Sequence, residues 1–103
     1  MKPFKLTREA KQDLRKIALF TEKKWGREQR YLYIKQFDNA FHLLAETPSV
    51  GKQCNHIKSD YRKLPQGSHI IFYSEAPKDN IVIIRILHKS MDVAPSLLGD
   101  SKD

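Results

Sequence analysis

An apolar run from Ile81 to Leu87 limits how this chain can fold. Arg85 alone interrupts the run, and the segment is far shorter than the roughly 20 apolar residues that a membrane span needs. A short run that is apolar at nearly every position is typical of a central strand covered on both faces. The rest of the chain must therefore supply strands that pair with this segment and other elements that cover it.

Two amphipathic segments in the first half of the chain can provide that cover. From Thr7, a candidate N-cap, apolar residues recur at helical spacing as far as Trp25, and Gly26 then supplies a stop signal. A second helical pattern runs over 27–46 and ends before Pro48, because proline steers the preceding residue out of the helical conformation. With only a turn around Gly26 between them, the two helices are expected to form an antiparallel hairpin.

Three further segments have the pattern of strands. Residues 3–6 alternate polar and apolar side chains and begin with a proline, which suits an edge strand. Segments 61–64 and 68–75 are separated by a Pro-Gln-Gly turn signal, so together with 81–87 they should form antiparallel neighbours. The order β-α-α-β-β-β predicts an α+β fold, in which a helical hairpin packs on one face of a small, twisted and mostly antiparallel sheet.

Length and charge narrow the class of protein. The chain of 103 residues is expected to form one domain over 1–103, with a flexible tail at about 99–103. Nineteen Lys and Arg against twelve Asp and Glu give a net charge of +7, which favours an anionic partner, either nucleic acid or an acidic polypeptide. One cysteine cannot form an internal disulfide, and we find no signal peptide or membrane-length apolar run. We therefore expect a cytoplasmic protein.

The sequence contains no Gly-rich phosphate loop, no metal-ligand spacing and no nucleophile elbow. Arg85 is the most informative polar residue, because a guanidinium inside an apolar strand needs a pair or an anion. It can pair locally with Glu75 or Asp92, or it can belong to a surface that binds an anion or a partner. Regular alternation would place Ile83 and Leu87 on one face with it.

Other candidate residues each have a structural and a functional interpretation. His88, three residues after Arg85, can be a structural histidine near the strand end, and Arg62 can be a solvated charge that protects a strand edge. Trp25 can fill the turn between the helices or serve as a stacking platform. The basic residues of the first helix can be merely solvated or can bind an acidic partner; these are Arg8, Lys11, Arg15 and Lys16.

Four segments carry a family resemblance: LTREAKQDLRKIALFTEKKWG, LLAETPSVGK, YRKLPQGSHIIFY and IVIIRILHKSMD. In this order and spacing the chain resembles the ParE branch of the RelE/ParE toxin superfamily over nearly its whole length. The resemblance implies a helical hairpin on an antiparallel-rich sheet. It also implies a non-enzymatic toxin of a type II toxin–antitoxin pair, which traps DNA gyrase on cleaved DNA and is neutralised by a ParD-like antitoxin with an acidic, disordered tail.

The RelE branch of the superfamily offers an alternative, because its members cleave messenger RNA on the ribosome. Arg62 and Arg85 match that branch's basic strand positions, but the tyrosine expected near the C-terminus is absent. Cleavage through a 2′-hydroxyl needs both a base and a charge clamp around one phosphate. The sequence shows the clamp more readily than the base, so we expect a gyrase inhibitor, with a ribosome-dependent mRNA endonuclease as the alternative.

The expected binding residues fall into two groups, and none of them is expected to be catalytic. Contact with the target or a partner is expected at Arg62, Arg85, His88, Met91 and Asp92. Contact with the antitoxin is expected at Arg8, Lys11 and Arg15. We expect no metal, no cofactor, no membrane association and no sequence-specific binding of nucleic acid.

Overall fold

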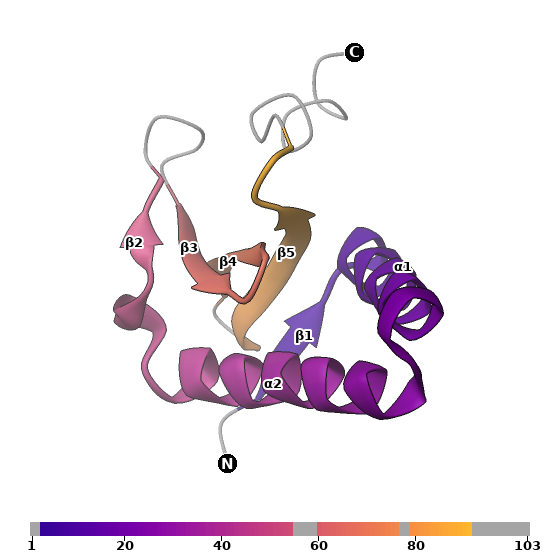
Figure 1. Ribbon diagram of the computed structural model, residues 1–103. Helices are drawn as coiled ribbons and strands as arrows, with labels where there is room; N and C mark the ends of the chain where they lie inside the picture. Colours follow the sequence, from indigo (N-terminus) through magenta and orange to yellow (C-terminus); the bar gives the residue numbers. More distant parts are fainter. Residues whose placement is uncertain (1–2, 55–59, 77–78, 92–103) are drawn as a thin grey trace.

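A five-stranded sheet runs through the computed structural model, which describes residues 3–54, 60–76 and 79–91 (Figure 1). The elements in chain order are β1 (Phe4–Leu6), α1 (Arg8–Trp25), α2 (Arg27–Glu46), the 3₁₀ turn η1 (Pro48–Val50), β2 (Lys52–Gln53), β3 (Tyr61–Gln66), β4 (His69–Ala76) and β5 (Asn80–His88). The sheet order is β1-β5-β4-β3-β2; β1 is parallel to β5, and the other neighbours are antiparallel. The predicted α+β class and element order are confirmed, and β2 and η1 are additions.

The helix boundaries follow from local signals that the sequence displays. The Thr7 side chain accepts a hydrogen bond from the Ala10 backbone N–H (3.0 Å) and so caps α1. Gly26 separates the two helices with a φ of +98°, a conformation that side-chain-bearing residues rarely adopt. Its N–H bonds to the carbonyl of Glu22 (2.8 Å), which closes the last turn of α1. Among the described residues no helix is long and apolar enough to cross a membrane.

Strand β5 lies inside the sheet, between β1 and β4, as its apolar sequence predicted. The two faces of the sheet are not equally covered. The main core joins the buried faces of α1 and α2 to sheet residues such as Ile71, Tyr73 and Ile83. A second, smaller cluster contains Phe72 and Leu87 and no helical residue. Among the described residues, cover by the helical hairpin is therefore confined to one cluster, and the other is formed by strand residues and by Cys54, which follows β2.

A bulge in β5 changes which side chains share a face. Phe72 pairs with Arg85, whereas the next residue, Tyr73, pairs with Ile83, so Ile84 is an extra residue in the ladder. Because a bulge shifts the alternation, Ile83 joins the helix-facing core and Leu87 the opposite cluster. The expectation that both share one face is wrong for this reason. The turn between β3 and β4 also falls later than predicted, since β3 extends to Gln66.

Tyr73 ties the loop before β2 to the core. Its hydroxyl accepts a hydrogen bond from the Gly51 N–H (2.8 Å) and donates one to the Pro48 carbonyl (2.6 Å). The ring is fully buried, and burial raises the pKa of the phenol, which keeps it a donor at neutral pH. A Cβ on Gly51 would overlap this hydroxyl. Gly51 is therefore required by the close approach of Tyr73.

We expect Gly51→Ala to lower the free energy of unfolding by about 1–3 kcal/mol, because the added methyl must displace a buried ring. The backbone at Gly51 has a φ of −76°, so alanine brings no backbone strain there. Without the steric conflict, a Gly→Ala change at such a site would stabilise the fold by about 0.4–1 kcal/mol. Urea denaturation measures the sign, with Val50→Ala, at an exposed neighbour, as the control. A stabilised Gly51→Ala variant would contradict the packing described.

Candidate functional site

Arg85, the charge inside the apolar strand, binds Asp13 of α1. Its Nε lies 2.7 Å from Asp13 Oδ2 and its Nη2 lies 3.0 Å from Oδ1, which is a two-pronged ion pair. Asp13 Oδ2 also accepts a hydrogen bond from the Ile86 backbone N–H (3.0 Å). The exposed fractions of the two side chains are 23% for Arg85 and 11% for Asp13. The sequence interpretation named other partners; Glu75 lies near the far end of β4, and Asp92 lies outside the described residues.

Arg62 is held by the backbone that precedes β2. Its Nη1 donates to the Gly51 carbonyl (2.8 Å) and lies 3.5 Å from the Ser49 carbonyl. Strand β2 covers the outer side of β3, so Arg62 is partly buried and is not on a sheet edge. The interpretation of Arg62 as a solvated edge charge is wrong, because β2 was not foreseen. The guanidinium groups of Arg62 and Arg85 thus bind different elements, on strands that β4 separates.

His88 ends β5 and is exposed. Its Nδ1 lies 2.8 Å from the Ser90 hydroxyl and accepts a hydrogen bond from the Ser90 N–H (3.1 Å), in agreement with a histidine bonded near the strand end. Its ring meets the ring of His69 edge-on, with 5.2 Å between their centroids. Met91 follows, 44% exposed, with its N–H bonded to the His88 carbonyl (3.0 Å).

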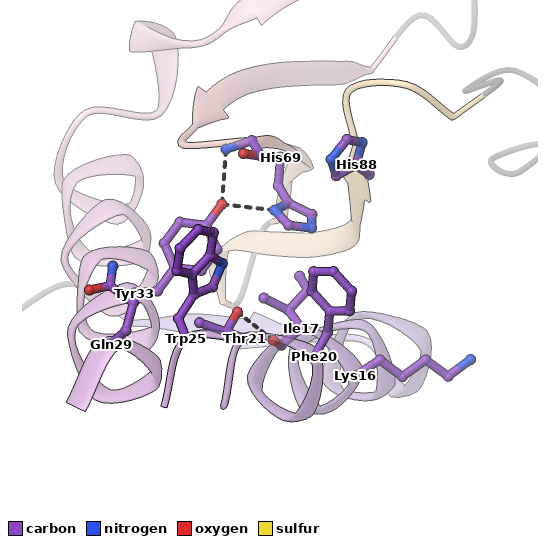
Figure 2. A pocket seen from close by; sticks show the side chains of 10 residues that line it. Lys16, Ile17, Phe20, Thr21, Trp25, Gln29, Tyr33, His69 and His88 are labelled. Atoms are coloured by element: carbon purple, nitrogen blue, oxygen red, sulfur yellow. Dashed lines mark hydrogen bonds between the residues drawn. The ribbon is translucent and has the colours of Figure 1, made fainter. Parts of the chain in front are cut away.

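A hollow of about 470 Å³ opens where α1, the start of α2 and the ends of β4 and β5 meet (Figure 2). We call it the aromatic pocket, and its lining residues are Lys16, Ile17, Phe20, Thr21, Trp25, Gln29, Tyr33, Ser68, His69 and His88. Trp25 is 65% exposed and Phe20 64%, so the tryptophan does not fill the turn between the helices. Figure 2 shows both rings rising from α1 toward His69 and His88. Of the two interpretations of Trp25, the exposed platform fits this arrangement.

A hydrogen-bonded pair forms the back of the aromatic pocket. The Tyr33 hydroxyl lies 2.8 Å from His69 Nδ1 and accepts a hydrogen bond from the Ser68 N–H (2.9 Å). Burial, and to a lesser degree the positive charge of His88, lower the pKa of His69 from its ordinary 6.5 to about 4. The imidazole is therefore neutral at physiological pH, and its Nδ1 can accept a hydrogen bond from the Tyr33 hydroxyl. The sequence carries no signal that joins Tyr33 of α2 to His69 of β4, because the contact depends on how the helix packs on the sheet.

A second concave surface lies between α1 and α2, and we call it the helix groove. It is lined by Lys11, Leu14, Arg15, Ala18, Arg30, Tyr31, Ile34, Lys35 and Asp38. Four cations thus surround an apolar floor that carries one carboxylate. Lys11 and Arg15 lie in the groove as the basic-face interpretation requires, whereas Arg8 is exposed on α1 and does not line it. Arg30 and Lys35 were missed, because only the packing of the helices brings them beside α1.

Comparison with known proteins now identifies the family. The family model described as the ParE toxin of the type II toxin–antitoxin system, parDE, matches residues 4–93. The chain is 36% identical over 97 residues to Toxin ParE1 of Caulobacter vibrioides, covering 94% of this chain and 99% of that protein. It is 35% identical over 88 residues to Toxin ParE1 of Mycobacterium tuberculosis H37Rv, covering 85% of this chain and 90% of that protein. The chain belongs to the ParE toxin family.

Solved structures agree with the ParE fold. A chain from the chromosomal ParDE toxin–antitoxin system of P. aeruginosa superposes with a TM-score of 0.71 at 20% identity, covering 85% of this chain and 96% of that one. A chain from the toxin–antitoxin complex RelBE2 of Mycobacterium tuberculosis gives a TM-score of 0.56 at 20% identity, covering 85% and 98%. The predicted RelE/ParE-like fold is confirmed. Among the described residues of this ParE-family chain, no cluster of His, Cys, Asp and Glu suits a metal ion.

We expect Asp13→Ala to lower the free energy of unfolding by about 3 kcal/mol, because it leaves the Arg85 guanidinium and the Ile86 N–H without their acceptor. Asp38→Ala, which removes an exposed carboxylate from α2, is the control and should change stability by about 0.5 kcal/mol at most. In a double-mutant cycle, Asp13→Leu combined with Arg85→Leu should destabilise less than the sum of the single changes. Additive losses would show that the pair does not couple α1 to β5.

We expect the stability of the protein to fall as the pH drops from 6.5 to 4 through His69. The lowered pKa means that the unfolded chain binds a proton in this window and the native state does not, so acid favours unfolding. His69→Gln keeps an acceptor for Tyr33 but cannot titrate. The melting temperature of this variant should therefore vary less over the window than that of the wild type. Parallel pH profiles of the two proteins would contradict the assignment.

Proposed function

We propose that this ParE-family toxin inhibits DNA gyrase by binding rather than by catalysis, and that a cognate antitoxin neutralises it. One observation carries the choice over a ribosome-dependent nuclease: the two arginines that could clamp a phosphate are already used within the fold. Arg85 is paired with Asp13, and Arg62 is bonded to backbone carbonyls before β2. A nuclease would have to release both groups before they could stabilise a transition state.

The surface that we propose for the target lies at the C-terminal end of β5. His88 and Met91 are exposed at the end of β5. His88 pairs with His69 of β4, and the Met91 N–H bonds to the His88 carbonyl, so both backbones are held while the side chains face solvent. We propose that they contact gyrase, together with Asp92 just outside the described residues. Arg85 supports this surface by tying β5 to α1 through Asp13, whereas Arg62 is bonded to the backbone before β2.

The helix groove is the proposed antitoxin site. Its cations, Lys11, Arg15, Arg30 and Lys35, surround apolar side chains of both helices. An acidic amphipathic segment could bury its apolar face on this floor while its carboxylates meet the cations. A disordered antitoxin tail is suited to such a site, because it can fold while covering a large area.

The gyrase proposal predicts linear DNA when purified protein, supercoiled plasmid, gyrase and ATP are combined. Omitting gyrase, with the protein present, is the control and should leave the plasmid intact. Unchanged plasmid at excess protein would overturn the proposal. Primer extension on transcripts from induced cells tests the alternative, since cuts within translated codons would instead support a ribosome-dependent nuclease.

The antitoxin proposal predicts that Lys11→Glu combined with Arg15→Glu raises the Kd for the antitoxin at least about tenfold, or about 1.4 kcal/mol. Lys5→Glu combined with Lys23→Glu makes the same change in net charge at exposed positions outside the groove. This control pair should bind with near wild-type affinity. Equal weakening by both pairs would mean that overall charge, and not the groove, attracts the antitoxin.

A further inference from the structure

Apart from His88, which also belongs to the proposed target surface, the residues of the aromatic pocket have no part in the proposed function. Phe20 and Trp25 both project from α1 with almost two thirds of their surface open to solvent. The Lys24 ammonium lies 5.9 Å from the Phe20 ring centroid and 5.6 Å from that of Trp25. The ammonium thus lies over both rings in cation–π contact, and these rings offer a flat group an aromatic surface next to a positive charge.

The walls of the aromatic pocket are built to hold a flat group. Ile17 and Thr21 are buried beneath the opening, and the Thr21 hydroxyl is already bonded to the Ile17 carbonyl (2.7 Å), which leaves an apolar floor. Tyr33 and the neutral ring of His69 stand at the back. The exposed ring of His88 forms a further wall (Figure 2). A planar ligand therefore has aromatic surfaces on more than one side.

Charge decides between the possible occupants. Among the described residues, those that line the aromatic pocket include Lys16 and no carboxylate. Exposed Lys24 lies beside its open rings, and exposed Lys89 follows His88 directly. The nearby carboxylate of Asp13 is held by Arg85. An aromatic side chain of a protein partner would use the rings but not these cations, whereas a nucleotide carries a flat base and a phosphate together.

We propose that the aromatic pocket binds an unpaired nucleotide of DNA. Its base stacks against Trp25 and Phe20, and its phosphate faces Lys16 and Lys24. The volume of about 470 Å³ is typical of a small-ligand site. Only an unpaired or extruded base can offer its face to such rings, because bases within a duplex are stacked on their neighbours. We choose DNA over RNA because the proposed target acts on DNA; to that extent the inference rests on the proposed function.

Trp25 allows a direct test, because it is the only tryptophan in the chain. A single-stranded DNA 10-mer should quench its fluorescence with saturation, and the apparent Kd should be at least about tenfold lower than for a duplex 10-mer. Heparin, a polyanion without bases, should leave the emission nearly unchanged. Equal quenching by the three ligands, or no quenching by the single strand, would overturn the proposal. An RNA 10-mer that binds as tightly as the DNA would overturn the choice of DNA.

Matched variants place the binding in the pocket. Phe20→Leu and Lys16→Gln should each weaken binding of a labelled single strand by about tenfold in fluorescence anisotropy. Their controls are Tyr31→Leu and Lys11→Gln, which remove an exposed ring and a charge from the helix groove instead. Equal losses in both sets would show non-specific electrostatic binding and overturn the proposal. All four sites are on the surface, and melting temperatures close to the wild type verify that the variants fold.

The outcomes of the binding, plasmid and antitoxin assays separate this inference from the proposed function. The binding assays contain no gyrase, so a failure to bind single strands leaves the gyrase proposal standing. Conversely, if single-stranded DNA quenches the Trp25 fluorescence but the protein never yields linear plasmid with gyrase, the protein has the nucleotide site and does not inhibit gyrase. If Phe20→Leu weakens the antitoxin while single-strand binding is unchanged, the pocket holds an antitoxin side chain and the nucleotide proposal is wrong.

Discussion

The fold depends on the carboxylate of Asp13, which accepts hydrogen bonds from β5 where a neighbouring strand would otherwise do so. Strand β1 ends at Leu6, and beyond it no strand of the described residues pairs with this edge of β5. Thr7 and Asp13 bind this edge instead. Thr7 donates hydrogen bonds to the carbonyls of Ile83 and Ile84, and Asp13 accepts hydrogen bonds from the Ile86 N–H and from the Arg85 side chain. The bulge at Ile84 is where β5 leaves the β1 ladder for α1. One helix thus satisfies a sheet edge that would otherwise expose unpaired backbone.

The ion pair with Asp13 explains why β5 carries a charged residue, Arg85, within an apolar segment. A guanidinium inside an apolar strand suggested anion binding, and in this structure the anion is part of the chain itself. Because α1 is fixed at Asp13, its later turns are held over the ends of β4 and β5, where Phe20 and Trp25 project beside His69. The ion pair is thus one of the contacts that position α1 beside the aromatic pocket, although it does not line the pocket.

Local signals in the sequence were enough to predict the helices, and long-range ones were not visible. The Thr7 cap, the glycine at 26 and the apolar period gave α1 and α2 their bounds, because each signal acts within a few residues. The two-residue strand β2, the bulge in β5 and the Asp13–Arg85 pair depend on register between segments up to 72 residues apart. The sequence predicted the aromatic pocket only in part. Trp25 was a candidate, but its exposure depends on how the helices pack on the sheet.

The two concave surfaces place cations of this basic chain in different chemical surroundings. In the helix groove, charges surround an aliphatic floor, which suits a folded amphipathic segment whose carboxylates pair at the rim. In the aromatic pocket, charges stand beside open rings, which suits stacking. Because Asp13 pairs with Arg85 and backbone carbonyls accept hydrogen bonds from Arg62, neither of these partly buried guanidinium groups competes for these ligands. The net charge of +7 alone therefore does not show that the cations border two different surfaces of α1, one lined by exposed aromatic rings and the other by apolar side chains of both helices.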